Sequence, residues 1–392
     1  MRKLNALLII AGVLALRSIV SAGGWLPALS RTFTPETSVQ GQGFMPVEGH
    51  DFKSKLASAA ERARSGNAPF WTAFSIDIRS GVAVDIGVKD YEALANGSAG
   101  ANVARVPLND TRQLGIFLLH APDGSRITGI EVYDLGRQRD YGGHPVYWLG
   151  HIRSDESLGF FQNVAEAHQT PQLAERAVMV IALHDDSRVP SILKDYARAT
   201  ADARVRETAI PWLGQIGGEQ TFLSDLVRDE NERPEIRKRA ALSLGIAKDK
   251  SALATIQSLY ESVTQPEVKK QLLLAASLSE NADESSDFLV KVAQGDGEIQ
   301  FRKLAVLWVG LRGGTQGLKA IEDIISDPAA DTELQKHAVL ALGQRADSAA
   351  LDLLLKVAKT HPKDVVRKRA IFWLGQKKDE RGQELLKKAL TK

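Results

Sequence analysis

The chain has 392 residues, of which 44% are hydrophobic and 25% charged, as is ordinary for a soluble folded protein. Its 50 basic and 48 acidic residues nearly cancel, which leaves no overall attraction for a polyanion such as nucleic acid. The chain contains no cysteine, so disulfides and a lipid anchor on cysteine are excluded. A chain of this length has room for two or three domains.

Residues 1–22 have the pattern of a secretory signal peptide. Arg2 and Lys3 precede an apolar run of 11 residues, and small residues follow at 20–22. The apolar run is short for a bilayer span. We therefore expect a periplasmic or secreted protein with no membrane span after cleavage, and an uncleaved anchor is the alternative. Removal of this segment leaves 47 basic against 48 acidic residues.

Residues 23–66 are predicted to form a flexible arm that ends in a short helix. Residues 23–50 are rich in Gly, Ser, Thr, Gln and Pro, and apolar clusters are few. An amphipathic helix is expected at residues 52–65, ended by Gly66.

Residues 67–152 have the period of β-strands. Apolar residues alternate with others in two runs, and two further runs flank the turn sequence APDGS, which is a strong hairpin signal. We predict one small, mostly antiparallel β domain. Its expected strands are at residues 70–78, 82–88, 114–120, 127–135 and 145–149.

Residues 153–392 contain an internal repeat of 31 to 33 residues. Each copy has an anchor residue, mostly alanine, with apolar residues four positions before and after it. These positions share one helix face, so each repeat presents an apolar stripe that it cannot bury alone. Such a period predicts a stacked solenoid in which each repeat supplies a first and a second helix. The anchors are Ala177, Ala209, Ala240, Leu272, Ala305, Ala338 and Ala370.

Three more positions recur around the anchor. Five residues after it stands a glycine in most copies, which we interpret as the helix stop. Three residues before it stands an arginine or lysine with acidic residues nearby, which indicates a solvated charge ladder between repeats. Three residues after it, tryptophans predict packing between repeats, with a stacking ladder for sugars or bases as the alternative. The glycines are Gly214, Gly245, Gly310, Gly343 and Gly375, the basic residues Arg206, Arg237, Lys269, Arg302 and Arg367, and the tryptophans Trp212, Trp308 and Trp373.

Three motifs resemble the HEAT-repeat family in its short form, which is also seen in phycobilin-lyase-like repeat proteins. They are VRKRAIFWLGQ at 366–376, IRKRAALSLG at 236–245 and VRETAIPWLGQ at 205–215. The resemblance implies an α+β chain with a right-handed α-α superhelical, armadillo-like solenoid of about seven repeats after the β domain. It also implies that the second helices line the concave face. The order of the two parts resembles that of exported bacterial HEAT-repeat proteins with an N-terminal β module.

The sequence contains no recognisable catalytic motif. No Walker loop, dinucleotide-binding glycine pattern or GxSxG sequence occurs, and none of the eight histidines has a close metal-ligand spacing. We therefore expect no catalytic, cofactor or metal residues, and we expect the chain not to be an enzyme.

The second helices supply the predicted partner-binding residues. Side chains at their exposed positions change in type from repeat to repeat, which suits a particular protein surface better than a repetitive polyanion. The leading hypothesis is an exported scaffold that binds a protein partner through the solenoid surface. The candidate contact residues are Lys194, Asp195, Asp225, Glu322 and Asp323.

Two alternatives stay open at this point. The first is an enzyme or small-ligand site where the β domain joins the solenoid, including a bilin lyase that only the repeat resemblance implies. The second is a nucleic-acid contact through basic residues such as Arg237 and Arg367. The identity of the partner and the oligomeric state do not follow from the sequence. Candidates for the junction site are Tyr141, His144, Trp148, His151 and Asp155.

Overall fold

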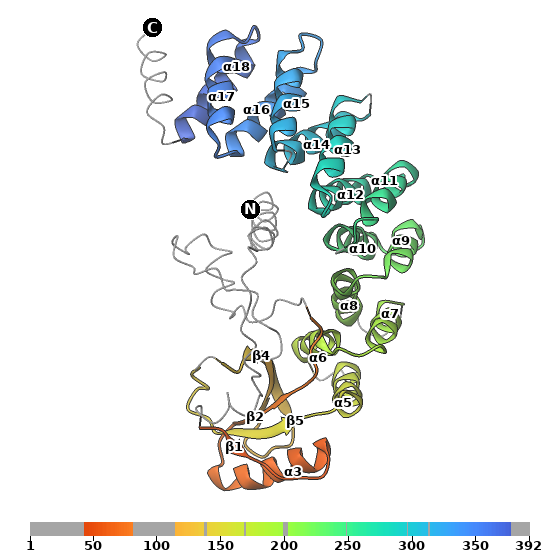
Figure 1. Ribbon diagram of the computed structural model, residues 1–392, viewed down its shortest axis with the longest axis vertical. Coiled ribbons are helices and arrows are strands. Elements are labelled where there is room, and N and C mark those ends of the chain that lie inside the picture. Colours follow the sequence, from red (N-terminus) through yellow and green to blue (C-terminus); the bar gives the residue numbers. More distant parts are fainter. Residues whose placement is uncertain are drawn as a thin grey trace, which may run out of the picture. The chain divides into compact units, whose positions relative to one another are not determined.

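The computed structural model divides the chain into two compact units, Met1–Ile192 and Leu193–Lys392, and each is described by itself (Figure 1). The predicted signal peptide, the arm up to residue 42, the strand at 82–88 and the end of the last repeat lie outside the described residues. The structure describes residues 43–80, 114–136, 139–167, 170–198, 203–247, 249–295, 297–312 and 314–377.

The first unit contains a sheet of five strands within the described residues, in the order β1-β5-β2-β3-β4. Strands β2, β3 and β4 are antiparallel neighbours, as the hairpin signal predicts, but β5 runs parallel to both β1 and β2. The predicted small β domain before the helical repeats is confirmed, but its sheet is mixed and not mostly antiparallel. Alternation along a strand reports burial and carries no information on direction. The strands are β1 (Met45–Pro46), β2 (Phe70–Ser75), β3 (Leu114–His120), β4 (Ile127–Asp134) and β5 (Val146–His151).

Both faces of this sheet carry aromatic residues. On one face, Phe74 of β2 packs against Phe52 of α3 (Phe52–Ala63) and Phe161 of α5 (Ser154–Glu166). On the other face, Phe44 and Phe117 belong to a buried cluster with Trp148. Phe44, Met45 and Val47 form only a short apolar run within a segment rich in Gly, Ser, Thr, Gln and Pro, so the composition predicts a flexible arm at residues 43–47. They belong instead to the sheet and its core.

The first repeat packs with the sheet in the first unit. Arg176 of α6 (Pro171–Leu183) lies 3.6 Å from Glu131 of β4. The backbone N–H of Arg79 donates to the carbonyl of Leu183 at 2.8 Å, and that of Asp185 donates to the carbonyl of Asp77 at 2.9 Å. The compact unit therefore extends to Ile192, beyond the change from strands to helices at residues 152–153.

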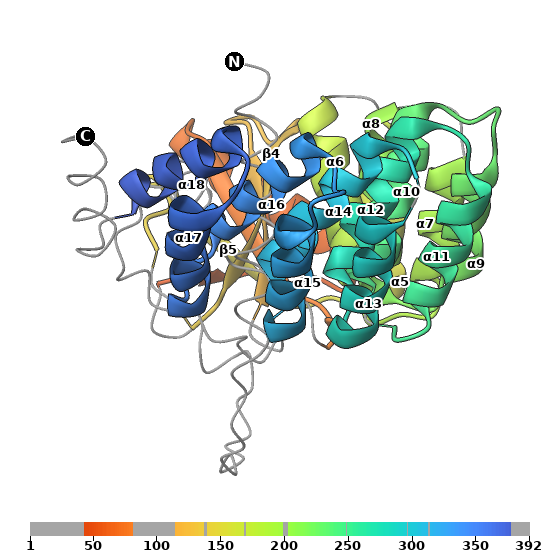
Figure 2. The same ribbon diagram turned by 90° about the horizontal axis from the view of Figure 1, so that it is seen from above.

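The second unit is a two-layer array of alternating helices (Figure 2). Even-numbered helices are the first helices of the repeats and pack on one another in one layer, and odd-numbered helices form the other layer. The elements are α7 (Val189–Arg198), α8 (Ala203–Ile216), α9 (Gln220–Arg228), α10 (Pro234–Ile246), α11 (Ala252–Ser262), α12 (Pro266–Leu278), α13 (Ala282–Gln294), α14 (Ile299–Arg312), α15 (Gly314–Ser326), α16 (Thr332–Gln344), α17 (Ser348–Thr360) and α18 (Asp364–Gln376).

The predicted repeat register is confirmed by burial. All seven anchors lie in the first helices α6 to α18 and are fully buried at 0% exposure. The residues four positions before and after each anchor are also buried, from Leu173 in α6 to Leu374 in α18. The apolar stripe that each repeat presents is thus covered by the helices packed against it, as the solenoid prediction requires.

The glycines five residues after the anchors do not end their helices. Gly214 and Gly245 lie inside α8 and α10, and neither has a positive φ. A Cβ on Gly214 would lie 2.5 Å from the carbonyl oxygen of Ser243 in α10, and one on Gly245 would collide with the backbone of Ala275 in α12. The predicted helix stop is wrong, because these glycines let neighbouring first helices approach closely.

Tryptophans three residues after the anchors take part in the same contact between neighbouring first helices. Trp373 of α18 lies directly over Gly343 of α16, where a Cβ would collide with the indole. Trp308 of α14 is 3% exposed. The indole of Trp373 packs between two first helices and Trp308 is buried, which favours the packing interpretation over a stacking ladder at these two positions.

Candidate partner-binding surface

The predicted contact residues lie on second helices in three repeats. Lys194 of α7 is 3.2 Å from the carboxylate of Glu219, and Glu322 of α15 is 2.9 Å from the ammonium group of Lys356 in α17. Asp225 of α9 faces Arg228 one turn along its own helix at 3.8 Å. Asp195 and Asp323 are exposed. These five residues belong to separate helices α7, α9 and α15, and the structure does not bring them together in one patch.

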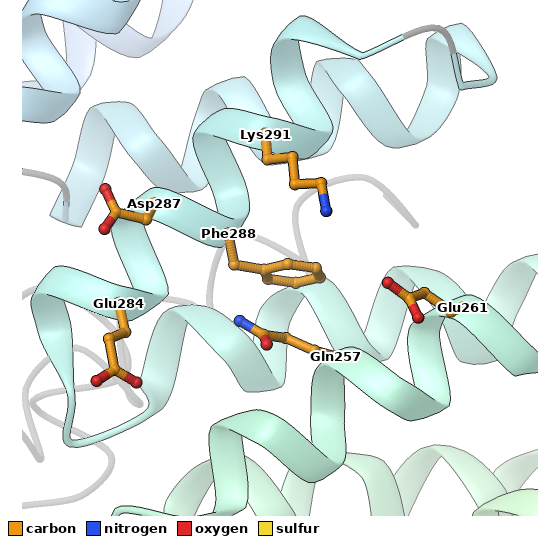
Figure 3. A pocket seen from close by; sticks show the side chains of 6 residues that line it. All are labelled: Gln257, Glu261, Glu284, Asp287, Phe288 and Lys291. Carbon is orange, nitrogen blue, oxygen red and sulfur yellow. The ribbon is translucent and has the colours of Figure 1, made fainter.

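A groove does open between second helices α11 and α13 (Figure 3). Its cavity measures about 280 Å³, and the ring of Phe288 from α13 forms its apolar part. Phe288 is only 8% exposed, and Tyr260 packs edge-on against it with ring centroids 5.6 Å apart. The remaining lining residues are Gln257, Glu261, Glu284, Asp287 and Lys291.

The basic residues three positions before the anchors are structural. The Nε of Arg237, which is 4% exposed, donates to the carbonyl of Val227 at the end of α9 at 2.8 Å, and Arg302 bonds Ala293 at the end of α13 in the same way. Gln335 takes the same position in its repeat and bonds the carbonyl of Ile325 at 3.0 Å. These side chains satisfy carbonyl groups that a helix C-terminus leaves unpaired. They are capping groups, so the predicted solvated ladder is wrong for them.

The junction candidates do not converge on one site. Tyr141 and Trp148 pack in the apolar cluster around Phe117. His151 lies near the carboxylate of Asp77 at 3.7 Å, and Asp155 pairs with Arg153 at 3.3 Å on the surface. Within the described part of the chain, no group of three or more potential ligands is placed to hold a metal ion.

One buried titratable group in the first unit is His120. Its Nε2 lies 2.8 Å from the hydroxyl of Thr72, and its ring stacks on Phe70 at 4.7 Å with an interplanar angle of 6°. Burial lowers the pKa of His120 to about 4, because the charged imidazolium would lose its hydration. This histidine therefore stays neutral at physiological pH and belongs to the core.

A different surface, formed by the first helices, carries an ordered pattern. The residue two positions after the anchor lies about 200° around the helix from it, so it points away from the buried stripe. This central solvent-facing position holds leucine in four successive repeats and phenylalanine in the next. The leucines are half-buried, and Phe372 is 52% exposed. We call these residues the leucine row: Leu242, Leu274, Leu307, Leu340 and Phe372.

Lysines run beside the leucine row. The residue two positions before the anchor is lysine in the same five repeats, and its side-chain exposure ranges from 23% at Lys303 to 74% at Lys368. Most of these lysines pair with a carboxylate in the first turn of their own helix, as Lys270 does with Glu267 at 2.8 Å. The lysine row comprises Lys238, Lys270, Lys303, Lys336 and Lys368.

The leucine row lies on the more tightly packed layer of the array. First helices approach one another at Gly214 and Gly245, whereas the groove separates second helices α11 and α13. Closer spacing in one layer than in the other bends a two-layer array toward the closer layer. Within the second unit, α8, α10 and α12 accordingly lie on the inner side of the bend (Figure 1). The repeat resemblance implies that the second helices line the concave face. That expectation is wrong, because first helices lie on the inner side of the bend (Figure 1).

Family comparisons agree with the repeat register. The family described as HEAT repeats matches residues 286–375, and the PBS lyase HEAT-like repeat matches residues 366–392. The C-terminal repeats of the helical array are therefore HEAT-like. None of the curated protein sequences compared with the chain matches it. No helix among the described residues is long and apolar enough to cross a membrane.

Several solved structures are distantly similar to the chain. Human deoxyhypusine hydroxylase in complex with glycerol is 16% identical with a TM-score of 0.28, and the match covers 55% of this chain and 84% of that one. The complex of CpcE and CpcF of phycocyanin lyase from Nostoc sp. PCC7120 is 15% identical with a TM-score of 0.31, covering 60% and 93%. Likeness at this level carries no information on function.

Proposed function

We propose that the protein is an exported scaffold that binds another protein through the surface of its HEAT-repeat array. The observation that carries the proposal is the leucine row, in which five successive repeats place a large apolar side chain at the centre of their solvent-facing helix surface. A solvated helix normally places polar residues there. Ordered apolar patches on a soluble protein are typical of sites for protein association.

The groove between α11 and α13 supports the same class of function less directly. It is lined by charged side chains around one ring and belongs to the other layer of the array. The five residues predicted on second helices remain a prediction for a second contact surface. The proposal assigns no catalytic step, cofactor or nucleic-acid contact to the chain. Export is supported by the signal-peptide pattern of residues 1–22.

Affinity capture with matched surface variants tests the proposal. We expect tagged protein, cross-linked in cells and recovered from the envelope or secreted fraction, to retain one partner. The L307E variant is expected to lose this partner because it places a carboxylate in the middle of the leucine row. The E322K/D323K variant tests the predicted second-helix surface in the same way.

The outcomes separate the two surfaces. Loss of the partner in L307E alone assigns binding to the first helices, and loss in E322K/D323K alone assigns it to the second helices. Recovery of the same proteins by wild type and by a variant that carries both sets of changes would contradict the scaffold proposal. Exclusion of the protein from the envelope and secreted fractions would contradict export.

A further inference from the structure

The leucine and lysine rows together define the chemistry of a partner. The two rows occur in the same five first helices, at positions separated by four residues, or about one helical turn. Each first helix α10 to α18 thus presents one apolar side chain with one ammonium group beside it. A complementary partner must present apolar groups flanked by negative charge on one side.

The spacing of the rows indicates the form of that partner. Packed helices lie about 8–10 Å apart, so neighbouring members of the leucine row recur at about that interval. Seven residues of an α-helix rise about 10 Å, and residues seven apart lie on nearly the same helix face. A partner helix lying across the first helices would therefore meet each successive repeat with one heptad.

The existing ion pairs of the lysine row are easily exchanged. Lys238, Lys270 and Lys336 each pair with a glutamate three residues earlier on an exposed helix surface. Water screens such exposed pairs and they contribute little to stability, so a partner carboxylate can replace the internal one at little cost. The lysines also keep much of their side-chain stem on the helix surface, which extends the apolar area around the leucine row.

Helix α14 is the centre of this surface. Its solvent-facing side carries Leu304, Leu307 and Leu311, all half-buried, beside Lys303. Its first turn contains no acidic residue, and Lys303 pairs across to Glu333 of the next repeat at 3.8 Å. Among the lysine-row ion pairs of α10 to α18, that of Lys303 in α14 is the longest, and it is the one made to a neighbouring repeat.

We propose that the leucine and lysine rows on α10 to α18 bind an acidic amphipathic helix of another protein, with one heptad of that helix per repeat. The apolar residues of the partner lie against Leu274, Leu307 and Leu340, and its carboxylates pair with the neighbouring lysines. This inference rests on the proposed scaffold function and adds the chemical class of the partner.

A designed peptide tests this chemistry on the full chain. The probe is a labelled peptide of four heptads, with leucine at two positions per heptad to form one face and glutamate at the flanking positions. The first control replaces every glutamate with lysine. The second keeps the composition but moves the leucines out of heptad register. Binding is measured by fluorescence anisotropy at low and at moderate salt.

We expect the acidic peptide to bind, the lysine peptide not to bind, and the out-of-register peptide to bind at least about tenfold more weakly. L307E is expected to weaken binding at least about tenfold, and K303E less, with a smaller salt dependence than that of wild type. E230K, in an exposed loop outside both proposed surfaces, is the matched control and should bind as wild type does. Thermal unfolding of each variant, with L307Q as a milder substitution, separates lost binding from lost folding.

Equal binding of the acidic and out-of-register peptides, or unchanged binding by L307E and K303E, would overturn the inference. Absence of peptide binding would overturn it too. A dimer of the chain that L307E disrupts, with no peptide binding, would assign the surface to a second copy and contradict the proposed partner. If the peptide fails but a partner is still lost in L307E cells, only the chemistry proposed here is wrong. Failure of both experiments contradicts the scaffold function itself.

Discussion

Gly245 of α10 lies directly against Ala275 of α12, so that a Cβ on Gly245 would collide with the backbone of Ala275. The same relation recurs one repeat earlier between Gly214 and Ser243. In both pairs the glycine is five residues after one anchor and its neighbour is three residues after the next anchor. The spacing of the first helices, and with it the surface that they present, thus depends on the absence of a side chain.

Replacement of Gly245 by alanine should destabilise the second unit. In an exposed helix this substitution stabilises by about 0.5–1 kcal/mol, because glycine disfavours the helix. At Gly245 the added methyl group meets backbone that cannot rotate away, and overpacking costs about 1–3 kcal/mol. Denaturant titration of the wild type and of Gly245→Ala gives the free energy of unfolding of each. The difference shows whether the substitution stabilises or destabilises the chain.

Gly159 of α5 provides the control, because it is helical and a Cβ there would meet no atom within 4 Å. Gly159→Ala should therefore leave stability unchanged or raise it. A stabilising effect of Gly245→Ala comparable with that of Gly159→Ala would refute the close-approach interpretation.

Replacement of Arg237 by methionine should lower the free energy of unfolding, because the role of this side chain is structural. The guanidinium group is 4% exposed and bonds the carbonyl of Val227 and, at 3.2 Å, the side chain of Gln265. Methionine would leave buried acceptors without a donor, which costs about 1–3 kcal/mol. Arg239 in the same helix is the control, since its pair with Glu207 is partly exposed and should contribute less than about 1 kcal/mol. Equal losses in the two variants would argue against the capping role.

Acidification should destabilise the first unit through His120. Its pKa is about 4 in the folded chain and near the ordinary value of 6.5 when unfolded, so the unfolded chain binds the proton first as pH falls. The stability linked to neutral His120 is fully present above pH 6.5 and is lost between pH 6.5 and pH 4. The total loss in the free energy of unfolding is about 3 kcal/mol. Unfolding of the wild type and of His120→Phe, followed from pH 7 to pH 4.5, measures it.

The phenylalanine variant should lose much of the pH dependence, while its ring still stacks on Phe70. Some dependence remains because burial also lowers the pKa of His184. An identical pH profile in the variant and the wild type would show that His120 does not carry the effect.

The repeat register was predictable because anchors such as Ala240 and Ala305 recur with apolar residues at fixed helical spacing. The role of Gly245 was not, since a glycine near the end of a helical run fits both a stop and a close approach, and only the neighbouring helix distinguishes them. The direction of β5 was unpredictable for a similar reason, because alternation is the same in parallel and antiparallel strands.

The leucine row could have been found in the sequence. Leu274 and Leu307 recur at the position opposite the anchor, where a solvated helix should be polar. The repeat resemblance instead implies a concave face lined by the second helices, and therefore favours residues such as Lys194 and Asp323. Which layer packs more tightly depends on contacts between repeats, and these are not visible in the pattern of one repeat.

Site-specific photo-cross-linking in cells tests directly whether the leucine row contacts a protein partner. A photoreactive amino acid is placed in turn at Leu274, Leu307 and Leu340, at Glu322 on the other layer, and at the exposed loop residue Glu230 as a control. We expect one cross-linked partner that is shared by the three leucine-row positions and absent from Glu230. Adducts at Glu322 but at none of the leucines, or no adduct at any position, would contradict it.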